Sequence, residues 1–257
     1  MKKLILTPTY NEKDNIRILI EDVFKYVDKN ADFRIIDDNS PDGTKEVIEK
    51  MMKKEKRLQF VKRSGKQGFA SAYLEQIKEE KKRKIYDVII TMDADLSHKP
   101  SYLPKMFELL KKNDLVIGSR YIKGGGIKNW NFERRMLSKY GNLYVRHIYN
   151  MKIRDCSTGF MGFRVEALAN IHLDKMRSRG YAFLSEFKYH FYLARKKIME
   201  MPIIFEERRH GVSKISKNII YEGLVLPVIL RNKIRKLYKN PQELKNLETV
   251  NKNYEEF

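Results

Sequence analysis

Short apolar runs alternate with charged segments of helical period along the first half of this chain, and no other feature constrains the fold as strongly. Strands and helices in strict alternation form right-handed βαβ units, which build a parallel sheet covered by helices on both faces. We predict strands at 3–7, 33–37, 59–62, 87–92 and 115–119, and helices at 13–29, 44–56, 70–82 and 103–111. The predicted fold class is therefore α/β, with ligands at the carboxyl ends of the strands.

Carboxylates follow several of the predicted strands. Glu12 comes after the first strand, Asp38 after the second, and Asp93 and Asp95 after the fourth. Since these strand ends meet at one edge of the sheet, their carboxylates should converge, which is costly unless a cation lies among them. Two carboxylates two residues apart can reach one divalent cation whose other positions are filled by water and diphosphate oxygens. A turn that caps the next helix is the competing interpretation.

A net charge of +20 indicates either an anionic partner or a lysine-rich, solvated surface. The anionic candidates are nucleic acid, lipid head groups and phosphorylated substrates. The acidic strand ends would repel the phosphates of a nucleic acid, so we expect no nucleic-acid partner. Arginine offers planar, paired donors to phosphate, and the cations that we single out are Arg120, Arg134, Arg208 and Lys214.

The region from Ile122 onward alternates less regularly. We expect a helix containing Arg134 and Ser138, a glycine-rich turn at 155–162, and a helix near 164–171. The segment from Ile219 to Tyr238 joins an apolar stretch, interrupted by Pro227, to a basic cluster. Such a segment suits a helix pair in a membrane interface, although a helix packed on the domain with a solvated basic face is the alternative. We find no apolar run of the roughly 20 residues that a spanning helix needs.

The lone cysteine, Cys156, permits no intramolecular disulfide, so a reducing compartment is the default. We expect the protein on the cytoplasmic face of a membrane, as a peripheral protein. Because no spanning helix is predicted, a small membrane-anchoring partner is one way in which it could be held there.

Six blocks of sequence identify a family. They are PTYNE at 8–12, DDNSPDGT at 37–44, DADLSHKP at 93–100, GSRY at 118–121, STGF at 157–160 and RHGVSK at 209–214. In order and spacing they resemble glycosyltransferase family 2, in its dolichol-phosphate (polyprenyl-phosphate) mannosyltransferase branch. The resemblance implies the GT-A fold, a single Rossmann-like nucleotide-binding domain at residues 1–217. The C-terminal amphipathic, basic segment at 218–257 would then lie on the membrane surface.

The resemblance also implies a role for each matched residue. It assigns the nucleotide sugar to Pro8, Tyr10, Glu12, Asp38, Asp93, Arg208 and Lys214. It assigns the acceptor phosphate to Arg120, Arg134 and Ser138, and Mg²⁺ or Mn²⁺ to Asp93 and Asp95. Asp95 and Arg120 are thereby also catalytic candidates. Ser97 stands where the mannosyl members usually carry Gln.

The acceptor decides whether a catalytic base is needed. A hydroxyl must lose a proton to attack, whereas a phosphate monoester is already anionic, so that positioning and charge stabilisation suffice. We therefore predict inverting transfer of one hexose, mannose before glucose, from a nucleotide diphosphate sugar such as GDP-mannose to a polyprenyl or dolichyl phosphate. The alternative is transfer to a hydroxyl of a lipid, glycan or protein with Glu186 as the base, unless Glu186 pairs with a nearby cation. A basic nucleic-acid-binding protein is a remote alternative.

Overall fold

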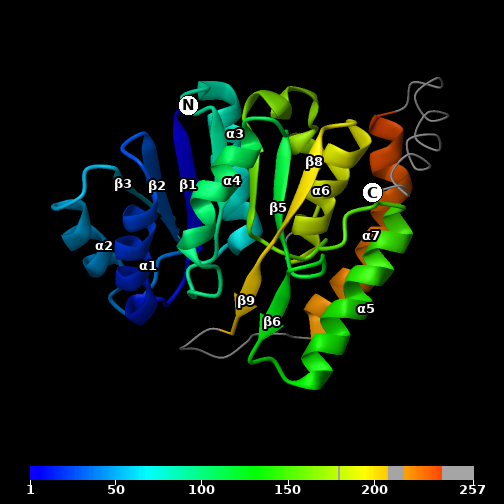
Figure 1. Ribbon diagram of the computed structural model, residues 1–257, viewed down its shortest axis with the longest axis horizontal. Helices are drawn as coiled ribbons and strands as arrows, with labels where there is room; N and C mark the ends of the chain where they lie inside the picture. The colour runs from blue at the N-terminus through cyan, green and yellow to red at the C-terminus, as the bar shows by residue number, and fades with distance from the viewer. Residues whose placement is uncertain (179, 208–216, 239–257) are drawn as a thin grey trace.

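The computed structural model describes residues 1–178, 180–207 and 217–238, except for the side chains of 217–221. Its centre is a seven-stranded, mostly parallel sheet flanked by helices (Figure 1). In spatial order the strands are β3 (Leu58–Lys62), β2 (Ala31–Asp37), β1 (Lys3–Thr9), β4 (Val88–Thr91), β7 (Met161–Arg164), β5 (Leu115–Ser119) and β8 (Ile198–Pro202). The helices are α1 (Lys13–Tyr26), α2 (Thr44–Met52), α3 (Phe69–Arg83), α4 (Leu103–Leu110), α5 (Phe132–Tyr149), α6 (Ala182–Leu193) and α7 (Lys217–Leu237). The predicted α/β class is confirmed.

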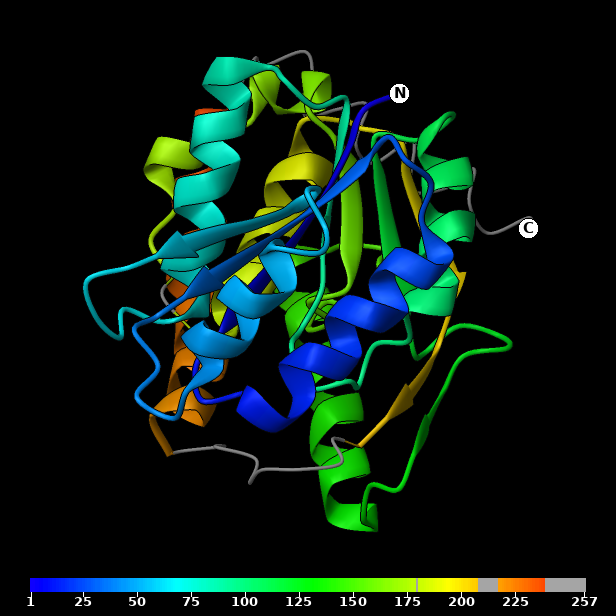
Figure 2. The ribbon, with the colours of Figure 1, turned by 90° about the vertical axis from the view of Figure 1, so that its left-hand side faces the viewer.

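Two hydrophobic layers cover the faces of the sheet. Side chains of a strand alternate between faces, and accordingly Leu4 and Leu6 of β1 join the layer beneath α3 and α6, whereas Ile5 joins the layer beneath α1, α2 and α4. Figure 2 shows the twisted sheet standing between α1 and α3. The five predicted strands and four predicted helices of the first half are all present, with ends shifted by a few residues.

The region around Gly162 differs from the prediction. The glycine-rich stretch was expected to be a turn leading into a helix, but Met161–Arg164 form β7, which runs antiparallel between β4 and β5. Only a short 3₁₀ helix, Glu166–Asn170, follows. Gly162 is needed because a Cβ there would lie 2.8 Å from Leu110 Cδ1 and 2.9 Å from Ile90 Cγ1. This glycine therefore marks close packing of helix on sheet, and no turn.

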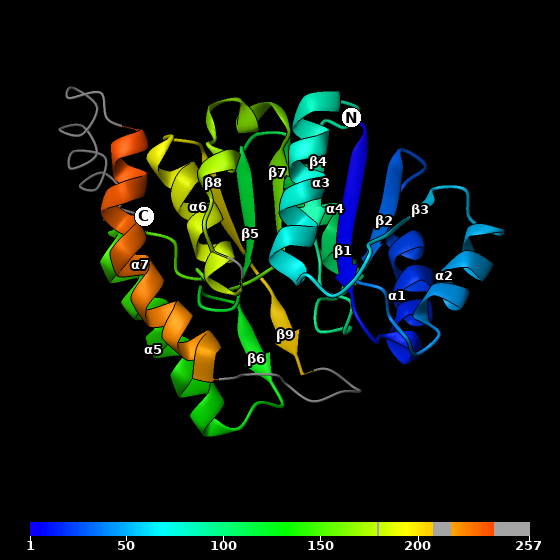
Figure 3. The same cartoon turned by 180° about the vertical axis from the view of Figure 1, so that it is seen from behind.

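The second half of the chain adds a flank beyond the sheet. A small parallel pair, β6 (Gly126–Lys128) and β9 (Ile204–Glu206), extends past the carboxyl ends of the main strands. Helices α5 and α7 run side by side at the same end of the molecule (Figures 1 and 3). The predicted helix pair broken at Pro227 is wrong, because α7 is one continuous helix through that proline. Of the helices within the described ranges, none is long and apolar enough to cross a bilayer.

Helix α7 has two different faces. Leu230 and Ile234 are buried in the core that lies under α6, and Tyr144 Oη of α5 donates to the Leu224 carbonyl at 2.7 Å. Other apolar side chains of α7 are exposed, and so are several on the neighbouring helix α5. We call these residues together the α5–α7 apolar surface: Phe132, Leu137, Tyr140, Leu143, Leu224, Val228 and Ile229. The segment thus packs on the domain and also presents an apolar face to solvent.

Candidate active site

A cavity of about 430 Å³ opens at the carboxyl ends of the central strands. Its polar lining comes from the ends of β1, β4 and β5 and from the start of α5. Its apolar lining comes from α3, α5, α6 and α7 and from Tyr181. The predicted site residues that it gathers are Pro8, Glu12, Asp93, Asp95, Arg120, Arg134 and Ser138. Of the four carboxylates expected to converge, Glu12, Asp93 and Asp95 therefore line one cavity, and Asp38 does not.

The two aspartates after β4 lie in a tight turn on the cavity wall. Asp95 Oδ1 accepts from the Ser97 backbone N–H at 3.1 Å and from Ser97 Oγ–H at 2.5 Å. The Asp93 side chain is 41% exposed, and Gly159 is so close that a Cβ there would lie 3.1 Å from Asp93 Oδ1. Both aspartates line the cavity. In the described part of the chain, no three His, Cys, Asp or Glu side chains form a complete metal site.

His98 packs behind the aspartates. It is buried between Phe160, at a ring-centroid distance of 5.1 Å, and Phe205, at 5.4 Å. Its Nδ1 accepts from the Asp93 backbone N–H at 3.3 Å. Burial lowers the pKa of His98, although the Asp93 carboxylate opposes this shift. A neutral imidazole therefore supports the turn.

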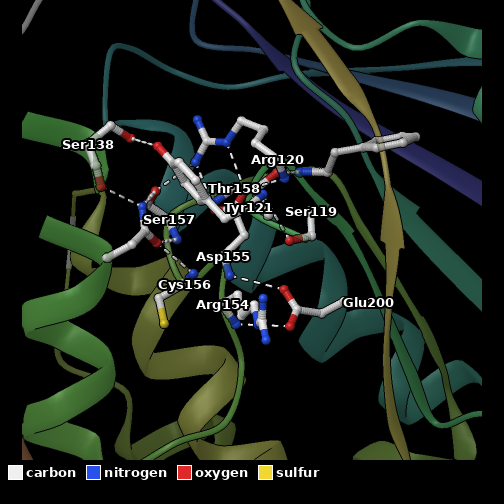
Figure 4. A network of polar contacts seen from close by, with 12 residues as sticks. Ser119, Arg120, Tyr121, Ser138, Arg154, Asp155, Cys156, Ser157, Thr158 and Glu200 are labelled. Carbon is white, nitrogen blue, oxygen red and sulfur yellow. Dashed lines mark hydrogen bonds and ion pairs between the residues drawn. The ribbon is translucent and has the colours of Figure 1, made fainter. Parts of the chain in front are cut away.

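Arg120 lies in a buried ion pair that the sequence did not reveal. Its Nε and Nη2 donate to the two oxygens of Asp155, both at 2.7 Å, and Nη2 also donates to Ser157 Oγ (Figure 4). Burial opposes ionisation of both groups, but their mutual attraction prevails, raising the pKa of Arg120 and lowering that of Asp155. Arg120 is only 7% exposed. Arg120 was expected to be a ligand of the acceptor phosphate, and the structure instead commits much of its guanidinium to Asp155.

Arg134 has a setting better suited to an incoming anion. Its guanidinium carbon lies 4.1 Å from the centre of the Trp130 ring, and Nη1 donates to Glu207 Oε1 at 2.6 Å. Among the described residues, Arg134 Nε has no hydrogen-bond partner. The predicted neighbour Ser138 lies one turn further along α5 and accepts from Tyr121 Oη at 2.6 Å. Arg134 is thus held over an aromatic ring while already binding one carboxylate.

Two residues predicted to bind the nucleoside do not line the cavity as the described residues define it. Asp38 is 6% exposed and holds the loop after β3, accepting from Arg63 Nη1 at 2.5 Å and from the Gly68 N–H at 2.8 Å. Tyr10 lies beneath the Lys66 ammonium, which is 4.3 Å from its ring centre. The roles given to Asp38 and Tyr10 stay predictions. Arg208 and Lys214 lie outside the described residues.

Glu186 is not at the cavity. It is fully buried in α6, and its carboxylate accepts from the backbone N–H groups of Arg177 at 3.1 Å and Ser178 at 2.9 Å. Burial raises the pKa of Glu186. This carboxylate stabilises the turn before α6 and does not line the cavity as the described residues define it, so its role as a base stays a prediction.

Several residues of the site carried no signal in the sequence. In the sequence Asp155 marks only the start of a glycine-rich turn, and Trp130, the single tryptophan, lies in none of the family motifs. Asn142 is buried and joins α5 to the STGF segment, since Oδ1 accepts from Cys156 N–H at 2.7 Å and Nδ2 donates to Ser157 Oγ at 2.9 Å. The sequence signal that points to Asp155 is its position two residues before the STGF motif.

The fold and the site together define a class of protein. A Rossmann-like sheet that ends in an Asp-x-Asp turn facing arginines is that of a GT-A glycosyltransferase. Solved structures of glucosyl-3-phosphoglycerate synthase from Mycobacterium tuberculosis share this fold. The complex with Mn²⁺, UDP and glucosyl-3-phosphoglycerate has a TM-score of 0.65 at 14% identity, covering 90% of this chain and 79% of that chain.

The chain belongs to glycosyltransferase family 2, whose sequence profile, "Glycosyl transferase family 2", matches residues 4–171. It is 35% identical to an undecaprenyl-phosphate mannosyltransferase of Micrococcus luteus over 88% of this chain and 92% of the relative. It is 34% identical to a polyprenol monophosphomannose synthase of Mycolicibacterium smegmatis over 87% of this chain and 84% of the relative. It is 35% identical to a dolichol-phosphate mannosyltransferase of Pyrococcus furiosus over 87% of this chain and 62% of that relative.

Proposed function

We propose that this glycosyltransferase moves one hexose from a nucleotide diphosphate sugar to a polyprenyl or dolichyl phosphate, with inversion at the sugar carbon. Mannose from GDP-mannose is the expected donor group, because relatives at about 35% identity are named as mannosyltransferases of polyprenol or dolichol phosphates. Glucose is the second choice.

The mixed lining of this cavity carries the proposal. Asp93 and Asp95 face it from β4 and Arg134 from α5, while Leu137, Leu184 and other apolar side chains supply the rest of the wall. A nucleotide sugar needs polar recognition and gains little from an apolar wall. A lipid phosphate needs an anion site beside an apolar surface, and this cavity offers both.

Arg134 and its surroundings suit the acceptor phosphate. Glu207 already places one carboxylate oxygen 2.6 Å from Nη1, so the guanidinium is oriented for an oxyanion. A phosphate oxygen attacks the sugar carbon while the bond to the leaving diphosphate breaks, and no proton moves in this step. The inward position of Glu186 supports the phosphate acceptor over the hydroxyl alternative, which requires a base at the cavity.

A divalent cation fits the carboxylates of the Asp-x-Asp turn. Asp93 and Asp95 offer hard oxygen donors on the cavity wall, and the missing side chain of Gly159 leaves room beside Asp93. When bound, Mg²⁺ or Mn²⁺ would neutralise charge on the leaving diphosphate. A cation held by these two carboxylates would keep coordination positions for diphosphate oxygens.

The α5–α7 apolar surface supports a place on the membrane. Leu224 lines the cavity and also belongs to this surface, so a bilayer against α5 and α7 would bring a lipid acceptor to the site. The basic residues at the end of α7, among them Arg235 and Lys236, suit an anionic leaflet. We propose that residues 218–257 act as this membrane-surface segment on the cytoplasmic face, with or without a small anchoring partner.

A donor panel tests the proposal. Purified protein is incubated with Mn²⁺, a short polyprenyl phosphate and each of several radiolabelled nucleotide sugars, and chloroform-extractable label is counted. We expect label from GDP-mannose, and none from Asp95→Ala. The matched control is Arg17→Ala, which changes an exposed side chain of α1 and should behave as wild type. Absence of extractable label with every donor would overturn the proposal.

A further inference from the structure

Glu207 follows β9 directly and reaches across to α5. Its Oε1 lies 2.6 Å from Arg134 Nη1, and the two side chains are 37% and 19% exposed. The neighbouring Glu206 points to different cations, with Oε1 2.7 Å from Lys99 Nζ and 3.8 Å from Lys128 Nζ. In the described part of the chain the two adjacent glutamates therefore pair with different cations, and Glu207 contacts an arginine of the cavity wall.

Trp130 fixes the place where this ion pair forms. Its ring lies under the Arg134 guanidinium at 4.1 Å, packs edge-on against Phe205 at 5.3 Å, and is 5.7 Å from the Arg120 guanidinium carbon. An arginine stacked on an aromatic ring has little freedom to swing away. A second anion can therefore bind to Nη1 of Arg134 only by displacing the Glu207 carboxylate.

We infer that Glu207 sets the affinity of the anion site, because it is a built-in carboxylate that competes with the acceptor phosphate for Arg134. This inference rests on the proposed function, because it takes Arg134 as the acceptor ligand. If the ion pair forms with equilibrium constant K in the free protein, every anion that must displace it binds weaker by the factor 1 + K. Weakly bound anions then fall below useful affinity, while a phosphate monoester still binds.

The same competition acts on the product. The acceptor is a monoester with nearly two negative charges at neutral pH, whereas the glycosylated product is a phosphodiester with one. The product is therefore held less strongly by Arg134, and the returning Glu207 carboxylate replaces it. The lipid product does not diffuse into water, so it leaves the site through the membrane. Its phosphate must dissociate from Arg134 first, and the returning carboxylate favours this dissociation.

Direct measurement of anion binding tests the inference without turnover. The probes are geranyl phosphate, a monoester, and methyl geranyl phosphate, a diester with the charge of the product. Isothermal titration calorimetry gives both dissociation constants in every variant, including Arg134→Ala, because it needs no reporter group at the site. Glu207→Gln should bind each probe about fivefold tighter, the upper range for a partly exposed ion pair. Its neighbour variant Glu206→Gln should match wild type.

The outcomes separate the inference from the function on which it rests. Loss of binding in Arg134→Ala together with tighter binding in Glu207→Gln supports both. Loss in Arg134→Ala with unchanged binding in Glu207→Gln overturns the competition and leaves the acceptor site intact. Unchanged binding in Arg134→Ala overturns the competition as well, because the anion site then lies elsewhere. In turnover, Glu207→Gln should lower the acceptor KM and strengthen inhibition by the diester by the same factor.

Discussion

Replacing Asp155 by Asn should destabilise the protein strongly, because it leaves Arg120 charged and buried without its counter-ion. Asp155 is fully buried and accepts from Arg120 Nε, Nη2 and the backbone N–H, at 2.7, 2.7 and 3.0 Å. Removing one partner of a buried pair costs about 3–5 kcal/mol. For a domain of this size each kcal/mol lowers the Tm by roughly 2–4 °C, so we expect a fall of about 10 °C.

Thermal unfolding followed by circular dichroism measures this fall. Glu21→Gln is the matched control, since it breaks the exposed Arg17–Glu21 pair of α1, whose side chains are 70% and 53% exposed. Surface pairs of this kind contribute roughly 0–1 kcal/mol, so the control should stay within about 4 °C of wild type. An Asp155→Asn protein as stable as the control would refute the view that Arg120 is held chiefly by this ion pair.

Three further changes have definite expected results. Gly159→Ala should leave the fold intact but raise the metal concentration needed for half-maximal turnover by about tenfold, because the new Cβ crowds Asp93 at 3.1 Å; unchanged metal dependence would contradict this. Glu186→Gln should keep kcat within about twofold, and loss of turnover in a folded variant would restore its role as a base. Burial lowers the pKa of Lys188 to about 8 from 10.5, so the unfolded chain binds more protons in that window. The free energy of unfolding should therefore rise by up to about 3 kcal/mol from pH 8 to 10.5 in urea titrations, and Lys188→Met should lose this rise.

Periodicity explains why the first half of the fold was predictable. Each parallel strand there is an apolar run followed by an amphipathic helix, and the pattern fixes both the element and the sheet edge where it ends. Asp93 and Asp95 could be placed for this reason. The strand β7 could not, because four residues with a glycine at the packing contact carry no periodic signal.

Partners distant in sequence explain the part that was missed. Arg120 is separated from Asp155 by 35 residues, and nothing local marks them as a pair. The position of Glu186 after residues 180–185 is compatible with a base. The direction of its side chain into the core, however, depends on how α6 packs. Family motifs indicated which residues gather, whereas charge pairing between them depends on tertiary packing.

The most direct test of the account compares two acceptors that differ only in the phosphate. Geranylgeranyl phosphate and geranylgeraniol are offered together with radiolabelled GDP-mannose and Mn²⁺, and the two lipid products are separated by charge. We expect label in the phosphodiester alone, with the signal strongly reduced in Arg134→Ala. Label that appears mainly in the neutral glycolipid would contradict the claim that the cavity positions an acceptor phosphate.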